Sequence, residues 1–138
     1  MYKRQLVYGA NNGAQISSNS WGYLSPGAYD QAELDAIDYY NSKDGLVVFA
    51  AGNGGTDEDW YPAYHDGAIA VAATDDHGDP AGFTCYGDWI DISAPGVWVL
   101  STGLGDEYEF MSGTSMACPH VSGVLALGKS VNLSLIHI

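Results

Sequence analysis

Two continuous apolar runs constrain the fold of this chain more than any other feature. The runs "LVVFAAGN" (residues 46–53) and "AIAVAATD" (residues 68–75) each have the length of a buried strand and end in polar residues. The segment before the first run, "YDQAELDAIDYYNSKDG", has the spacing of an amphipathic helix, with Leu34, Ile37 and Tyr40 facing inward. A helix that leads into a wholly apolar strand is typical of a parallel sheet covered on both faces, so we predict an α/β fold.

The remaining elements fit the same fold class. The stretch "WIDISAPGVWVLST" (residues 89–102) predicts one or two strands broken at Pro95-Gly96, and "EYEFMSG" (residues 107–113) predicts another. A largely apolar helix is expected from Thr114 or Ser115 to about Lys129, buried through Val121, Val124, Leu125 and Leu127. Three acidic side chains of the first helix are expected to face water: Glu33, Asp35 and Asp38.

Composition excludes several classes of function. The chain carries 4 Lys+Arg against 17 Asp+Glu, a formal net charge of -13, so nucleic-acid phosphates would be repelled. Such an acidic surface suits a secreted or salt-exposed protein, and it equally suits solubility alone. No apolar run approaches the roughly 20 residues of a membrane span, so no membrane partner is expected. The two cysteines, Cys85 and Cys118, lack the spacing of a metal site.

The two ends of the chain have an unusual relationship. The opening "MYKRQ" and the closing "LSLIHI" can be encoded by one inverted DNA sequence, which matches a transposon-end adapter used in preparing sequencing libraries. The alternative is a chance similarity between two short peptides. We therefore predict that residues 6–132 form one partial domain and that residues 1–5 and 133–138 are translated adapter.

Ser115 is the first candidate for chemistry. It lies between Gly113 and the apolar helix, where unpaired backbone amides and the positive end of the helix dipole would stabilise a developing oxyanion. Local features alone favour a simpler role, because Ser and Thr are the commonest N-cap residues.

The wider pattern favours catalysis. The stretch "SGTSMACPHVSG" resembles the nucleophile motif of the subtilisin-like serine proteases, usually written GTSMA-x-PH, and "NSWG" and "AAGN" stand upstream in the order and approximate spacing of that family. The resemblance covers essentially all of residues 6–132. It implies a parallel α/β sheet flanked by helices, truncated at its N-terminal side, with the active site at the carboxyl ends of the strands.

The resemblance also implies roles for individual residues. Ser115 resembles the nucleophile, and Asn53 resembles the side-chain donor of the oxyanion hole, although alone Asn53 would be read as a turn residue. The backbone of Ser20, Trp21 and Gly22 resembles the edge that pairs with substrate, although "NSWG" alone would be read as an ordinary turn. The opposite wall of the S1 pocket is then formed by Ala50, Ala51 and Gly52.

The general base is expected to lie outside this sequence. No histidine occurs between Leu6 and Asn53, where the family has its catalytic histidine upstream of the oxyanion asparagine. His65 and His77 follow Asn53, and His120 resembles a structural histidine packed behind the active-site helix. We therefore expect an inactive fragment that lacks the catalytic Asp and His. Its incomplete sheet is expected to expose the apolar faces of "LVVFAA" and "AIAVAA".

The parent protein is expected to be a secreted serine endopeptidase that acts on polypeptides through an acyl-enzyme on Ser115 and requires no cofactor. Two alternatives stay open. One is a pseudoprotease or binding module that retains the fold, and the other is an α/β-hydrolase esterase, which the absence of a Gly-x-Ser-x-Gly elbow disfavours.

Three further features carry secondary hypotheses. Trp60 in "WYPAY" resembles the residue at the S1 floor that tunes depth, where it would favour small P1 residues unless it packs elsewhere. Calcium is common in the family, and Asp75 or Asp91 could supply ligands to a structural ion in the parent. Cys85 and Cys118 could pair, although two separate buried thiols are the favoured state.

Overall fold

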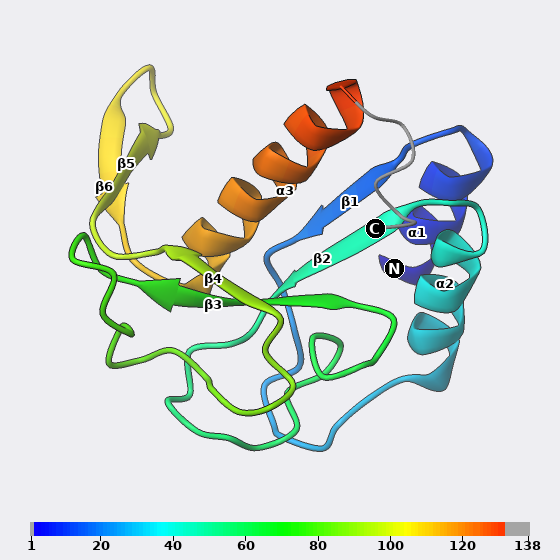
Figure 1. Cartoon of the computed structure of the whole chain (residues 1–138), viewed down its shortest axis with the longest axis horizontal. Helices are drawn as coiled ribbons and strands as arrows, with labels where there is room; N and C mark the ends of the chain where they lie inside the picture. Colours follow the sequence, from blue (N-terminus) through cyan, green and yellow to red (C-terminus); the bar gives the residue numbers. More distant parts are fainter. Residues whose placement is uncertain (1, 132–138) are drawn as a thin grey trace.

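The computed structural model describes residues 2–131 and contains one parallel sheet between two helical layers (Figure 1). The sheet has the order β1-β2-β3-β4, all parallel, and β5 and β6 form a separate antiparallel hairpin. This confirms the predicted fold class. The elements are α1 (Tyr2–Asn11), β1 (Ile16–Asn19), α2 (Gln31–Asn41), β2 (Leu46–Ala50), β3 (Ile69–Thr74), β4 (Ile92–Pro95), β5 (Val99–Thr102), β6 (Tyr108–Met111) and α3 (Thr114–Val131).

The central strands are apolar throughout because each faces a different helical layer on its two sides. In β2, Val47 and Phe49 pack in the core that contains α1 and α2, whereas Val48 and Ala50 pack in the core that contains α3. Successive side chains of a strand point to opposite faces, so a strand covered on both faces needs apolar residues at every position. The apolar faces of β2 and β3 are therefore buried, and the expectation that they would be exposed is wrong.

Helix α2 forms where its sequence pattern predicts it. Asp30 caps the helix, because its carboxylate accepts a hydrogen bond from the Ala32 amide at 2.9 Å. Leu34, Ile37 and Tyr40 are buried, as predicted. Asp35 and Asp38 are exposed, as predicted. Glu33 was also expected to face water, but it is only 7% exposed, and its carboxylate accepts a hydrogen bond from the Tyr23 hydroxyl.

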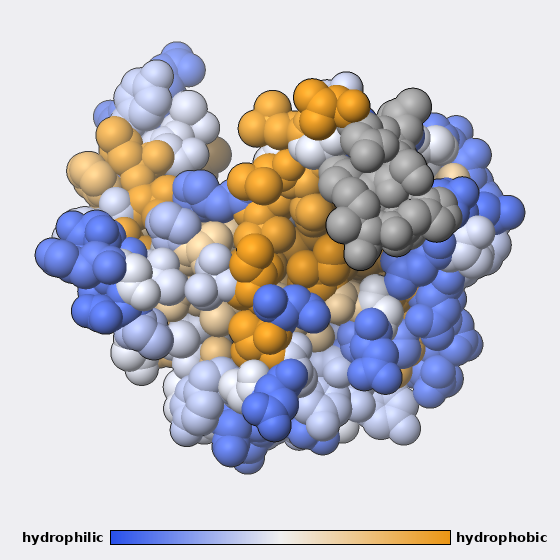
Figure 2. Space-filling view, in the orientation of Figure 1, coloured by the Kyte–Doolittle hydropathy of each residue, from blue (hydrophilic) through white to orange (hydrophobic). Residues whose placement is uncertain are grey.

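Helix α3 is less buried than its apolar sequence predicts. Val121 faces the sheet, but Val124 and Leu127 are 67% and 71% exposed. A helix that is apolar all round can bury only the face that contacts the sheet, so its other face forms an apolar surface in this chain. Figure 2 shows this surface over α3, together with apolar residues of the β5–β6 hairpin, among which Leu100 and Phe110 are exposed.

Two elements near the N-terminus were not predicted. Strand β1 has the sequence "ISSN", which lacks the apolar run of a buried strand, and α1 includes residues that the sequence analysis set aside as adapter. In α1, the Lys3 ammonium lies 2.8 Å from the Asp30 carboxylate. The other proposed adapter segment, residues 133–138, lies outside the described residues. Within residues 2–131, no helix is both long and apolar enough to cross a membrane.

The exposed face of α3 generates a prediction about this chain produced alone. We expect it to self-associate, because contiguous apolar surfaces favour association. Changing Val124→Ser and Leu127→Ser together should raise the monomer fraction measured by light scattering coupled to size-exclusion chromatography. Leu24→Ser is the control, since Leu24 is 96% exposed on the loop after β1 and should leave the monomer fraction unchanged. A wild-type chain that is monomeric at every concentration would contradict this prediction.

Candidate active site

A cleft of about 350 Å³ opens where β1 and β2 end and α3 begins. The carboxyl ends of parallel strands meet at one edge of a sheet, so segments that are distant in sequence converge there. Every residue that the sequence analysis assigned to the site lines this cleft, as do the additional residues Tyr23, Leu24, Gly54, Tyr61 and Thr114. The predicted residues are Ser20, Trp21, Gly22, Ala50, Ala51, Gly52, Asn53, Trp60 and Ser115.

Ser115 lies in the first turn of α3 and is half-buried. Its hydroxyl is 3.5 Å from the Ser20 carbonyl oxygen, and the Ser20 hydroxyl donates to the Ser115 carbonyl at 2.8 Å. These contacts join the start of α3 to the end of β1. Backbone amides in the first turn of a helix have no partner within the helix, so they remain available to an anionic group.

Asn53 is held in one orientation by Thr114. The side-chain oxygen of Asn53 accepts two hydrogen bonds at 2.9 Å, from the Thr114 amide and from the Thr114 hydroxyl. The same hydroxyl accepts a hydrogen bond from the Gly52 amide at 3.2 Å. With its oxygen occupied, Asn53 presents its Nδ2 donor to the cleft. Sequence reasoning missed this role, because Thr114 resembles only a helix-start residue.

Gly113 lies close to two hydrogen-bond donors of the site. A Cβ atom placed on Gly113 would lie 3.4 Å from Asn53 Nδ2 and 3.7 Å from the Ser115 amide nitrogen. Both nitrogen atoms therefore lie within 4 Å of one point at Gly113, next to the cleft that Asn53 and Ser115 line, and the absence of a side chain at Gly113 keeps that point uncrowded. An amide side chain and a backbone amide close to a serine are the groups that can stabilise a tetrahedral oxyanion in acyl transfer.

Trp60 is part of the wall of the cleft. Its indole Nε1 donates to the Thr56 hydroxyl at 2.9 Å, and its ring would be 2.7 Å from a Cβ on Gly54. The ring therefore packs directly on the backbone of the turn that follows β2. Neighbouring Tyr61 has a pKa raised above its ordinary value by burial and then by the negative charge of Asp59, so it remains a neutral phenol.

The histidines do not provide a base for Ser115 within the described residues. His65 bonds to Asp38 at 2.7 Å, His77 bonds to Asp76, and the Nδ1 of His120 lies 2.8 Å from the Met116 carbonyl oxygen. His120 is exposed, so the expectation that it packs behind the helix is wrong for this chain. The reason is that it lies on the face of α3 that does not contact the sheet.

The residues considered for calcium and for disulfide bonding are separate from the cleft chemistry. Among the described residues, Asp75 forms a group with Asp76 and His77 whose ligand atoms lie within 4.8 Å of one another, and Asp91 is not part of it. Asp91 instead accepts a hydrogen bond from the Ala70 amide. A structural calcium ion stays a prediction. Cys85 and Cys118 are both buried free thiols, which confirms the favoured state.

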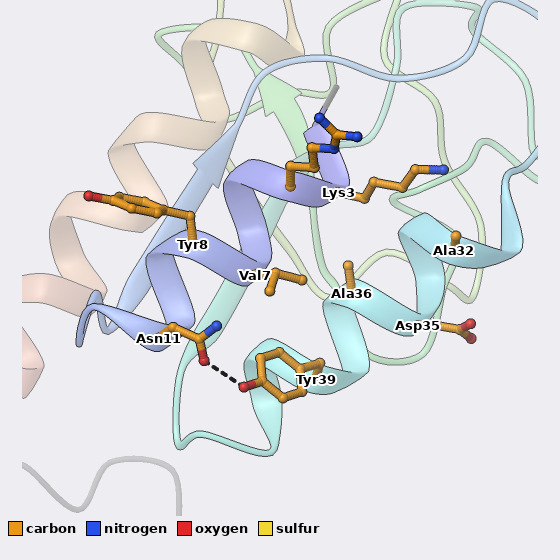
Figure 3. A pocket seen from close by; sticks show the side chains of 9 residues that line it. Lys3, Val7, Tyr8, Asn11, Ala32, Asp35, Ala36 and Tyr39 are labelled. Carbon is orange, nitrogen blue, oxygen red and sulfur yellow. Dashed lines mark hydrogen bonds between the residues drawn. The ribbon is translucent and has the colours of Figure 1, made fainter.

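A larger cavity lies away from this chemistry. It has a volume of about 550 Å³ and opens between α1 and α2, where the Tyr39 hydroxyl donates to Asn11 at 2.6 Å (Figure 3). Val7 and Ala36 form part of its wall, and Lys3 and Arg4 also line it. None of the residues that line the cleft at Ser115 lines this cavity.

The fold is an α/β domain, and its cleft holds a serine at a helix N-terminus with an asparagine side-chain nitrogen and a backbone amide nearby. A family model for the Subtilase family matches residues 1–136, and the chain belongs to this family. It is 43% identical over 123 residues to thermitase of Thermoactinomyces vulgaris, covering 88% of this chain and 43% of the relative. It is 47% identical over 125 residues to a thermostable alkaline protease of Halalkalibacterium halodurans, covering 91% of this chain and 34% of the relative.

Solved structures agree with these sequence relatives. The structure of the prenylagaramide maturation protease PagA superposes with a TM-score of 0.90 at 35% identity, covering 96% of this chain and 50% of that chain. The structure of an S218A mutant of the protease domain of PatA superposes with a TM-score of 0.86 at 38% identity, covering 91% of this chain and 47% of that chain. The chain therefore spans half or less of the length of these relatives.

Gly52 provides a stability test of the cleft geometry. Its φ of +107° is unfavourable for residues with a side chain, and an added Cβ would lie 3.2 Å from the Cys85 sulfur. Gly52→Ala should therefore lower the free energy of unfolding by about 1–3 kcal/mol, measured by chemical denaturation. Gly82→Ala is the matched control, because the space around Gly82 is open. If Gly52→Ala and Gly82→Ala had equal free energies of unfolding, Gly52 would not have the positive φ and the close contact with Cys85 that this turn shows.

Proposed function

We propose that the complete protein containing this chain is a serine endopeptidase that hydrolyses peptide bonds through an acyl-enzyme on Ser115. The observation that carries this proposal is that Ser115 and Asn53 line one cleft, with Asn53 Nδ2 and the Ser115 amide nitrogen both within 4 Å of one point at Gly113 and the Asn53 oxygen held by Thr114. Membership of the Subtilase family and the names of the relatives, which include thermitase and several alkaline proteases, support the same reaction class.

The chemistry follows from these groups. The Ser115 oxygen attacks the scissile carbonyl carbon while its proton passes to a general base, and the carbonyl oxygen becomes an oxyanion between the two donors. Collapse of the tetrahedral intermediate breaks the C–N bond, and the base returns its proton to the leaving amine. Water then attacks the acyl-enzyme by the same route, which releases the carboxylic acid and restores the hydroxyl.

The general base comes, in this proposal, from polypeptide outside the described residues. A serine hydroxyl is almost wholly protonated at neutral pH and needs a neighbouring base to become a good nucleophile. His65, His77 and His120 have other partners. We therefore propose that a histidine, oriented by an aspartate, reaches Ser115 from another part of the complete protein, and that this chain alone is inactive.

The substrate class is a polypeptide. The cleft is an open groove, and its wall at Ser20–Gly22 is not paired with a strand, so its backbone groups are available to an extended peptide. We also propose that the complete protein is secreted, as the acidic composition permits. A pseudoprotease is the second candidate, favoured by one observation: none of the histidines in residues 2–131 bonds to Ser115.

Ser115 gives the direct test. The complete protein should hydrolyse a casein substrate, and Ser115→Ala should abolish turnover, because no other group replaces the nucleophile. A fluorophosphonate probe should label the wild-type protein stoichiometrically and leave the variant unlabelled. The chain of residues 1–138, produced alone, should remain unlabelled. Stoichiometric labelling of Ser115 in that short chain would mean that it contains its own base.

Trp60 gives a test of specificity. Because its ring packs on Gly54 and lines the cleft, where it narrows the space for a substrate side chain, we expect the complete protein to prefer small P1 residues. Trp60→Ala should shift the preference toward Phe and Tyr by about tenfold or more in kcat/KM, since one ring-sized volume is opened in an apolar pocket. The measurement is a P1 peptide library assayed with both proteins. A wild-type preference for Phe or Tyr would contradict this assignment.

A further inference from the structure

The loop between β1 and α2 forms one wall of the cleft without regular secondary structure. It runs from residue 20 to residue 30, and Leu24 and Gly27 are among its exposed residues. Such a loop keeps its position only through specific contacts, because it has no ladder of strand hydrogen bonds. The position of the wall therefore depends on a small number of anchors.

Tyr23 provides two of these anchors. Its backbone amide donates to the Tyr61 carbonyl at 3.0 Å, which joins the wall to the segment that carries Trp60. Its hydroxyl donates to Glu33 Oε2 at 2.6 Å, which joins the wall to α2. Gly27 adds a third contact, from its amide to the Asp59 carbonyl at 2.8 Å. Tyr23 is thus the residue at which both sides of the cleft and α2 meet.

Glu33 is an unusual residue for this position. It is 7% exposed in the first turn of α2, and it was expected to face water. A buried carboxylate is costly unless it is hydrogen-bonded, and the positive end of the helix dipole together with the Tyr23 hydroxyl stabilises it here. Burial and the hydrogen bond to Glu33 hold the pKa of Tyr23 well above its ordinary value, so the hydroxyl remains a donor at every physiological pH.

From this geometry we infer that Glu33 is a positioning residue, which fixes the Ser20–Gly22 wall for peptide binding through the hydroxyl of Tyr23. The inference rests on the proposed function. The predicted effect is on substrate binding rather than on the nucleophile. Ser115 belongs to α3 and contacts Ser20 through hydrogen bonds that do not involve Tyr23, and Asn53 is held by Thr114. Neither group contacts Glu33 through a described hydrogen bond.

The kinetic experiment uses the complete protein and a short alanine-rich peptide anilide. Tyr23→Phe and Glu33→Ala should each raise KM about tenfold with kcat within about twofold of wild type, because each removes a charge-assisted hydrogen bond. Glu33→Gln keeps an acceptor oxygen and should recover most of the affinity. The KM of the double variant Tyr23→Phe/Glu33→Ala should be no higher than the higher KM of the two single variants, since both changes remove the same contact.

Two controls separate positioning from general destabilisation. Tyr29→Phe removes a hydroxyl from an exposed tyrosine of the same loop and should leave KM unchanged. The rate of labelling by a fluorophosphonate should be the same in all variants, because that small probe reports Ser115 and not the wall. A lower melting temperature with unchanged KM would overturn the inference, and so would a fall in kcat at constant KM.

A binding measurement distinguishes failure of this inference from failure of the proposed function. In a Ser115→Ala background, a fluorescein-labelled form of the same peptide should bind about tenfold more weakly when Tyr23→Phe is added. If the wild-type protein does not hydrolyse the peptide but binding still depends on Tyr23, the proposed function fails and the positioning role stands. If hydrolysis occurs and neither KM nor binding depends on Tyr23 or Glu33, the positioning role fails alone.

Discussion

The burial of β2 and β3 between two helical layers is the constraint on which the rest of the structure depends. Both strands are apolar on both faces, so their position is fixed by α1 and α2 on one side and by α3 on the other. Because the strands are parallel, β2 delivers Asn53 to the same edge at which α3 begins. The separation between the serine and the asparagine is therefore set by packing in the core, at a distance from the cleft.

Thr114 converts this packing into a defined chemical geometry. It is 1% exposed, and its hydroxyl both accepts from Gly52 and donates to Asn53. A side-chain amide can rotate to present either its oxygen or its nitrogen, and only the nitrogen is useful to an oxyanion. By occupying the oxygen, Thr114 selects the useful orientation before any substrate is present. Such prior organisation is what makes electrostatic stabilisation effective in an active site.

The sequence predicted most of the fold, because the spacing of apolar residues along a helix or strand indicates which side chains are buried. The runs at residues 46–53 and 68–75 and the helix around Ile37 are where they were expected, and the motif around Ser115 identified the family and the cleft residues. Periodicity failed where burial depends on tertiary partners. Glu33 is buried by a tyrosine ten residues away, and Val124 is exposed because nothing in residues 2–131 covers that face of α3.

The polar contacts of the cleft were not predictable from pattern, for a related reason. The Thr114–Asn53 pair joins residues 61 positions apart, and the Tyr23–Tyr61 contact joins two loops. Neither has a periodic signature. Strand β1 was missed because three of the four residues in "ISSN" are polar, which reflects its place at the edge of the sheet.

The division between core and loops has an evolutionary consequence. Residues of β2 and β3 each pack against neighbours on both sides, so substitutions there disturb two cores at once. The segment around Leu24, by contrast, contributes little to either core, although it lines the cleft. Sequence change can therefore accumulate in the loop. In the proposed protease it would alter which peptides bind, while the residues that β2 and α3 contribute to the cleft stay the same. The substrate specificity of the proposed protease can therefore change between related proteins at little cost to the stability of the fold.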